Sequence, residues 1–151
     1  MKTILFILLT FICCASFAGT QSSLPLKGKI ALLLGIEITP TPAALLLDLT
    51  QSQTNLKVAS GKLFSNSGSG FKVTVSSSNQ GKLKRIGGNN LFPYAMKFGP
   101  VDVPLSSTAE FVYPLPLNYT DDITVSYTGV PASNLIAGDY IDTITFTISA
   151  L

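Results

Sequence analysis

Among the side chains of this sequence, the carboxylates have the type and spacing that calcium binding or acid–base catalysis would need. Asp121 and Asp122 are adjacent, and Asp139 is followed closely by Asp142. Carboxylates bind calcium or transfer protons when they converge on one site. Neighbouring side chains in a strand point to opposite faces, so we expect Asp121 and Asp122 to lie in a solvated turn. We expect Asp139 and Asp142 to flank the start of the last strand, at a solvated edge.

Histidine and thiol chemistry is excluded by composition. The sequence has no histidine, and its two cysteines, Cys13 and Cys14, belong to the signal peptide predicted below. Catalysis by a histidine base or a thiolate, and metal sites built from these ligands, need residues that the mature chain lacks. We therefore expect no enzyme activity, no cofactor and no metal site.

Basic and glycosylation signals are also weak. Lys82, Lys84 and Arg85 lie within 81–88, where they would suit an acidic glycan or a lipid headgroup. Next to a Gly-Gly turn we expect them to form a solvated hairpin instead, and the segment lacks the Gly-Lys-Ser/Thr sequence of a phosphate loop. Asn118 opens a formal N-glycosylation sequon, which we expect to be unused.

Apolar side chains alternate in 92–98, where two interpretations compete. They would form either a sugar-binding platform or part of the core. We expect core packing, because alternation at strand spacing is typical of it and the sequence has no tryptophan. The alternating residues are Phe92, Tyr94, Met96 and Phe98.

The first 18 residues are predicted to be a cleaved secretory signal peptide. Lys2 precedes an apolar run over 4–11, and Ser16 and Ala18 are the small residues that a signal peptidase requires. The run is shorter than the ~20 residues of a membrane-spanning helix. Cleavage leaves nine Lys and Arg against eight Asp and Glu. That balance disfavours nucleic acid and acidic membranes as partners, and no later segment is predicted to span a membrane.

Period-two alternation of apolar residues recurs along the mature chain and predicts strands. Short strands separated by Ser, Asn and Gly turns indicate a single all-β domain, an antiparallel β-sandwich. We expect the proline-containing segment 111–122 to be an irregular edge or a long connection. Strands are expected near 45–49, 56–58, 71–75, 92–98, 101–105, 123–127 and 140–148.

An unusually long apolar ribbon occupies 24–38. Fifteen extended residues reach about 50 Å, whereas a sandwich of this size is roughly 35 to 40 Å across. Either Gly28 or Gly35 breaks the ribbon into two strands of one monomer, or residues from about 20 to 31 insert beside a strand of a neighbouring subunit. In the second case the domain's own first strand begins near residue 32. The ribbon's apolar residues are Leu24, Leu26, Ile30, Leu32, Leu34, Ile36 and Ile38.

Two segments carry a family resemblance. Residues 38–83 resemble secreted bacterial fimbrial subunits, the pilin-like β-sandwich proteins related to the spore coat protein U domain. Residues 137–149, "AGDYIDTITFTIS", are similar to their closing strand. Many relatives also have a cysteine pair near the first strand, which this chain lacks after processing.

The resemblance implies an immunoglobulin-like sandwich that lacks its final strand and is assembled by the chaperone–usher route. A periplasmic chaperone, then the N-terminal extension of the next subunit, would fill the gap, and an outer-membrane usher would export the fibre to the cell surface. The implied division is a signal peptide over 1–18, a donor extension over 19–31 and a pilin-like domain over 32–151. The donor residues would be Leu24, Leu26, Gly28, Ile30 and Leu32. The acceptor groove would be flanked by Ile36, Ile38, Ile144, Phe146 and Ile148.

Two functions follow from these patterns. The first is a structural subunit of a surface fibre, a pilus or fimbria, that polymerises by strand exchange with identical or related subunits. The alternative is a self-contained exported binding module or adhesin whose first ribbon folds back into its own sheet.

Overall fold

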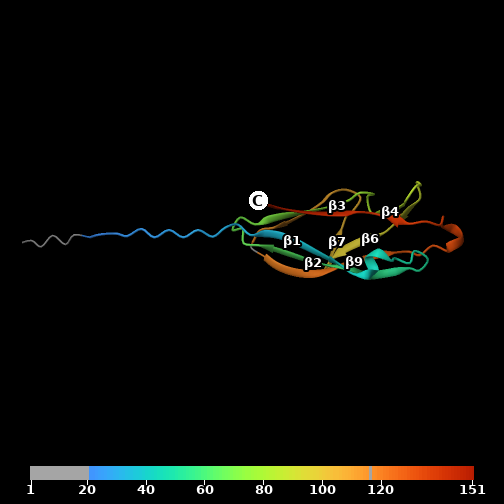
Figure 1. Cartoon of the computed structure of the whole chain (residues 1–151), viewed down its shortest axis with the longest axis horizontal. Coiled ribbons are helices and arrows are strands. Elements are labelled where there is room, and N and C mark those ends of the chain that lie inside the picture. Colours follow the sequence, from blue (N-terminus) through green and yellow to red (C-terminus); the bar gives the residue numbers. More distant parts are fainter. Residues whose placement is uncertain (1–20, 116) are drawn as a thin grey trace, which may run out of the picture. The chain divides into compact units, whose positions relative to one another are not determined.

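The period-two segments form two facing layers of antiparallel sheet (Figure 1). The computed structural model of the chain describes residues 21–115 and 117–151, so the predicted signal peptide lies outside the described residues. One layer is a five-stranded sheet in the order β1-β2-β9-β6-β7. Its strands are β1 (Leu34–Pro40), β2 (Gln53–Ser65), β9 (Leu117–Tyr127), β6 (Ala95–Phe98) and β7 (Val101–Val103).

The second layer consists of two three-stranded sheets, ordered β11-β3-β8 and β10-β4-β5. The chain passes from β3 to β4 and from β10 to β11 through short breaks, so the two small sheets follow one another along this layer. Two short 3₁₀-helices, η1 (Pro42–Leu45) and η2 (Ala132–Asn134), lie in connections. The strands are β3 (Phe71–Ser77), β4 (Lys82–Arg85), β5 (Leu91–Pro93), β8 (Ala109–Tyr113), β10 (Tyr140–Ile141) and β11 (Ile144–Ala150).

The core lies between the layers and comes from alternate residues of both. Val73 and Val75 of β3 are each 2% exposed, and Ile123 of β9 is 3% exposed. Alternating side chains of a strand point to opposite faces, so one face of each strand fills this core. The buried apolar residues are Ala59, Leu63, Phe71, Val73, Val75, Leu83, Phe92, Met96, Val103, Leu105, Ala109, Ile123, Val125 and Tyr127.

Several expectations from the sequence are confirmed. The described part of the chain is all-β and antiparallel, and the strand predicted at 71–75 is β3. Phe92 and Met96 are buried, which confirms core packing for the 92–98 segment. That segment is two strands rather than one, because the chain crosses from β5 in one layer to β6 in the other at Tyr94.

The strand predicted at 45–49 is absent, and that prediction is wrong. Pro40 and Pro42 lack the amide donors that a continued ladder would need, and Pro42 stands at the start of η1, where proline favours helical geometry. Asp48 then forms a turn, accepting hydrogen bonds from Thr50 N at 2.9 Å and Thr50 Oγ1 at 2.6 Å.

The irregular connection predicted at 111–122 is also wrong. Strand β8 ends at Tyr113, just before Pro114, and β9 begins at Leu117. β9 is paired on both sides, with β2 and with β6, so Asp121 and Asp122 lie within a central strand and not in a solvated turn. The prolines of this segment, Pro114 and Pro116, lie between β8 and β9 in the sequence. Their missing amide donors therefore do not interrupt the ladder of either strand.

Helices long and apolar enough to cross a membrane do not occur among the residues the structure describes.

Leu63 tests the packing of this core. It is fully buried, with 0% exposure, on β2. We expect Leu63→Ala to lower the free energy of unfolding by about 2 to 5 kcal/mol, because it removes buried apolar volume and leaves a cavity. Thr145→Ala, on the exposed face of β11, is the control and should change it by less than about 0.5 kcal/mol. Urea unfolding followed by circular dichroism measures both, and equal effects would contradict the assigned core.

Candidate strand-binding groove

Two edge strands face each other along one side of the sandwich. β1 pairs with β2 and β11 pairs with β3, and within the described residues neither strand has a ladder partner on its other side. Cα atoms of β1 and β11 nevertheless come within 8 Å of each other. A strand edge without a partner presents a row of free backbone donors and acceptors. This side of the sandwich therefore has two edges that lie close together and that no described strand pairs.

The side chains between the two edges are apolar and half-buried. On each strand they alternate with exposed polar residues, such as Glu37 on β1 and Thr147 on β11. All of them pack against the core while part of each side chain stays accessible. An apolar floor between two strand edges is the geometry of a groove for an added strand. The floor consists of Leu34, Ile36 and Ile38 of β1 with Ile144, Phe146 and Ile148 of β11.

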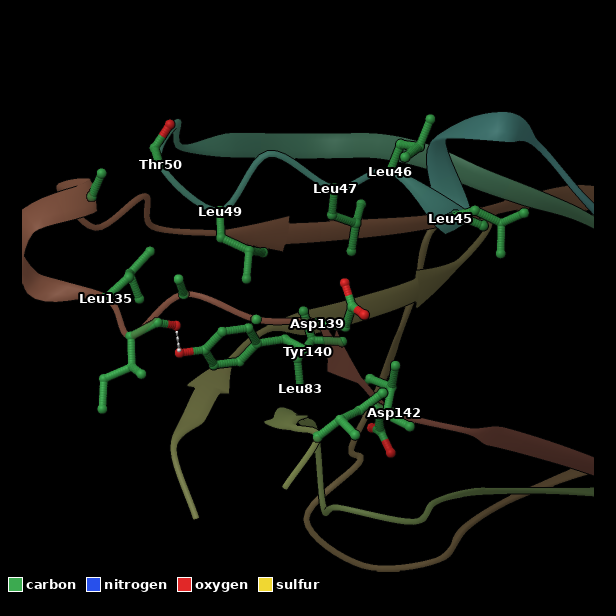
Figure 2. A pocket seen from close by; sticks show the side chains of 17 residues that line it. Leu45, Leu46, Leu47, Leu49, Thr50, Leu83, Leu135, Asp139, Tyr140 and Asp142 are labelled. Carbon is green, nitrogen blue, oxygen red and sulfur yellow. Dashed lines mark hydrogen bonds between the residues drawn. The ribbon is translucent and has the colours of Figure 1, made fainter. Parts of the chain in front are cut away.

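An apolar cleft of about 720 Å³ lies beyond these two strands in the chain. One wall is the 44–50 segment, which follows β1, and the other is 135–142, which precedes β11. Figure 2 shows Leu47 and Leu49 pointing from the first wall toward Tyr140 and Leu83. Each wall is thus next in the chain to one of the edge strands, although the residues that line the cleft lie outside β1 and β11.

Hydrogen bonds hold the walls of the cleft. Val130 N donates to Leu49 O at 3.0 Å, and the Tyr127 hydroxyl donates to Asp48 O at 3.2 Å. The Tyr140 hydroxyl donates to Ile136 O at 2.9 Å (Figure 2). The hydrogen bonds from Thr50 lower the pKa of Asp48, so this rim carboxylate is ionised at neutral pH.

Asp142 bridges the break between the two small sheets of the second layer. The prediction that it lies at a solvated edge is wrong. Its carboxylate accepts hydrogen bonds from the Ser77 hydroxyl at 2.6 Å and the Tyr94 hydroxyl at 2.7 Å. It also accepts the backbone amides of Asn79 at 3.0 Å and Thr143 at 2.8 Å. These bonds join the end of β3 to the β10–β11 wall, so Asp142 has a structural role. Asp139 is exposed, as predicted.

The other candidate residues are likewise held in structural contacts. Asp121 accepts a hydrogen bond from the Tyr119 hydroxyl, and Asp122 forms an ion pair with Lys57 at 2.6 Å. These two carboxylates therefore have separate partners. In the part of the chain that the structure describes, no three acidic, histidine or cysteine side chains gather as metal ligands.

The basic segment 81–88 forms the predicted hairpin, in which β4 pairs with β5. Lys82 and Lys84 are exposed. Arg85 Nε donates to Ala137 O at 2.9 Å, which connects the hairpin to a wall of the cleft.

Asn66 fixes the entry to β1. Its side-chain amide donates to Ala31 O at 2.9 Å, and its side-chain oxygen accepts Leu33 N at 2.7 Å. Its backbone amide donates to Leu33 O at 3.0 Å. One asparagine thus holds residues 31 to 33 extended alongside the end of β2.

The segment before this entry, residues 21–30, is exposed and has no regular secondary structure. Leu24 is 83% exposed, and Leu26 and Ile30 are each 89% exposed. The structure places the five predicted acceptor residues on β1 and β11, and the roles of donor and acceptor stay predictions. Leu47, Leu49, Leu135 and Tyr140, which line the cleft, were missed as site residues. The prolines before 45–49 were the available signal that this apolar stretch is not a strand.

No protein-family model and no curated protein matches the chain. Among solved structures it is similar to the minor tip subunit HdaB of the E. coli Hda pilus, with a TM-score of 0.38 and 11% sequence identity. The similarity covers 76% of this chain and 79% of that subunit. A likeness at this level does not establish a family or a function.

Alkaline pH tests the Asp142 contacts. Burial, followed by the hydrogen bond to Asp142, raises the pKa of Tyr94 above its usual 10.0. The hydrogen bond to Asp121 raises the pKa of Tyr119 to about 12. The folded state thus keeps protons that the unfolded chain releases above pH 10, so the free energy of unfolding should be at its full value below pH 10 and fall as the pH rises.

Tyr94→Phe should make this alkaline fall shallower and, at neutral pH, lower the free energy of unfolding by about 1.5 to 3 kcal/mol, because Asp142 loses one donor. Urea unfolding as a function of pH, with tyrosinate absorbance recorded in parallel, measures both effects. If tyrosinate forms in the native protein at the same pH as in the unfolded chain, the assignment is wrong.

Proposed function

We propose that the chain is a structural subunit of a bacterial surface fibre and that it assembles by donor-strand exchange. In this proposal the extension over residues 19–31 of one copy enters the groove of the next copy. The observation that carries the proposal is the pair of unpaired edges, β1 and β11, facing each other across an apolar floor. The sequence resemblance to fimbrial subunits supports it independently of this geometry.

The extension complements the groove in backbone and in side chains. An inserted strand would supply hydrogen-bond partners to β1 on one side and to β11 on the other. The two strands would have to move apart to admit it, because two ladder spacings amount to about 9.5 Å and Cα atoms of β1 and β11 lie within 8 Å of each other. Its alternation would direct Leu24, Leu26 and Ile30 onto the apolar floor, and Gly28 would leave one position without a side chain. Each Leu or Ile that becomes fully buried stabilises the joint by about 1.5 to 3 kcal/mol.

The length of the extension also matches. Residues 24 to 30 span about 23 Å when extended, at ~3.3 Å per residue. β1 has seven residues and therefore covers about the same length. One extension would thus run along the whole of β1 while Asn66 keeps residues 31 to 33 with the donor's own domain.

The extension of the same chain fits its own groove poorly. Asn66 holds residues 31 to 33 extended, so a chain that turns back does so before Ala31. A two-residue turn at residues 29 and 30, the shortest common hairpin loop, puts residue 25 opposite Leu34. Leu26 and Ile30 would then lie outside the groove. Intermolecular insertion uses the apolar residues that folding back would leave exposed.

The fibre proposal includes export. The predicted signal peptide would direct the chain to the periplasm, where a chaperone would cover the groove until an outer-membrane usher presents the next subunit. The mature protein would then stay at the cell surface as part of the fibre. Leu24, Leu26 and Ile30 are exposed, and the groove floor is apolar. Both surfaces favour nonspecific association, so the subunit would need a chaperone before assembly.

Two complementary variants test the proposal. A chain that lacks residues 20–31 should accept a strand but donate none. A full-length chain with Phe146→Glu should donate but not accept, because a charge replaces an apolar residue of the groove floor. We expect no polymer from either variant alone and one heterodimer from the mixture, seen on an unboiled denaturing gel and by size-exclusion chromatography.

Thr147→Glu is the matched control, because Thr147 is the next residue of β11 and is exposed. It should polymerise like the unmodified chain. Fibres from the truncated chain, or a mixture that stays monomeric, would refute strand exchange. A stable monomer of the unmodified chain, formed without a chaperone, would favour the self-contained binding module.

A further inference from the structure

Apolar contacts alone do not determine which extensions the groove accepts. The groove-facing residues of the extension are Leu24, Leu26, Ile30 and Leu32, with Gly28 between them. A slip of two residues keeps the same face toward the groove but exchanges Gly28 for an aliphatic side chain, so this pattern favours one register. It does not distinguish extensions that share the pattern and differ in charge, so another interaction must provide that selectivity.

Charges on the outward face provide that interaction. Lys27 and Lys29 stand at alternate positions, on the face opposite Leu26 and Ile30. No acidic residue occurs before Glu37 in the sequence. The extension therefore carries two positive charges close together and no negative charge.

Glu37 is the one charged residue of the two strands that border the groove; β11 presents only Thr and Ser on its outward face. Its side chain is 59% exposed, and only a 3.6 Å contact links its Oε2 to Lys62 on β2. An outward residue of an inserted strand would lie on the same face as Glu37. The lining of the cleft includes two acidic residues, the exposed Asp139 and the half-buried Asp142.

Taking strand exchange as the function, we propose that Glu37 determines the selectivity of the groove for a cationic extension by pairing with Lys27 and Lys29 of the incoming chain. Opposite charges on neighbouring strands attract when their Cβ atoms are directly opposite or one position diagonal. With the lysines two residues apart on the outward face, a register that places one of them directly opposite Glu37 places the other one position diagonal. The proposed partner is thus a cationic extension, such as that of a second copy of this chain.

A charge exchange tests the proposal with the whole mature chain. The acceptor is the mature chain with Leu26→Asp and Ile30→Asp, which should disable its own extension without altering its groove. The probes are two fluorescent peptides covering residues 20–33, one with the natural lysines and one with Lys27→Glu and Lys29→Glu. Each peptide is titrated against the acceptor with Glu37 and against the same acceptor with Glu37→Lys.

We expect the lysine peptide to bind the Glu37 acceptor about 3- to 10-fold more tightly than the glutamate peptide, since two cross-strand pairs change from attraction to repulsion. Glu37→Lys should reverse the preference. Added salt should reduce it, because exposed charges are screened. Glu110→Lys is the control. Glu110 lies on β8, which does not border the groove, and forms an ion pair with Lys72 of β3. Its replacement should leave the preference unchanged.

The outcomes separate the two levels of the proposal. Equal binding of both peptides to both acceptors overturns the role of Glu37 and leaves strand exchange intact. Binding of neither peptide to either acceptor overturns strand exchange and the role of Glu37 with it. A preference that Glu110→Lys reverses as strongly as Glu37→Lys shows a general charge effect and also overturns the proposal.

Discussion

Backbone hydrogen bonding at the edges β1 and β11 is the constraint on which the rest of this structure depends. Among the residues that the structure describes, each strand is paired on one side only, and the apolar side chains between them are half-buried. Water can satisfy the free backbone groups, but it cannot replace the apolar contacts of Ile38 or Phe146. A strand with alternating apolar residues satisfies both needs at once. The core is thus packed, and the described residues leave two strand edges unpaired along one side.

Polar contacts hold the segments that border β1 and β11 in place. Asp142 joins β3 to the wall formed by β10 and β11, and Asn66 holds the entry to β1. The turn at Asp48 and the hydroxyl of Tyr140 support the walls of the cleft. A groove with fixed walls lowers the entropy lost when a strand binds. The carboxylates that first suggested chemistry are held in structural contacts.

Sequence patterns predicted the strands with strict alternation and missed those where special residues interrupt it. β3 and β11 each have one apolar and one polar face, so their positions follow from the sequence. β9 was recognised only in part, because adjacent Asp121 and Asp122 resemble a turn although Tyr119 and Lys57 satisfy them. At 45–49 the alternation of leucines was misleading, because the preceding prolines end the ladder. The residues expected to form the acceptor lie on β1 and β11, whereas the cleft joins 44–50 to 135–142, which are far apart in sequence.

Amide hydrogen exchange tests the central claim most directly. In the monomer, the amides of β1 and β11 that point away from β2 and β3 should exchange rapidly, since they lack partners. In the assembled fibre the same amides should become protected, while the amides in the core of β9 stay protected in both states. Slow exchange of the outward amides of β1 and β11 in the solitary monomer would contradict the account, because it would show that the edges are already paired.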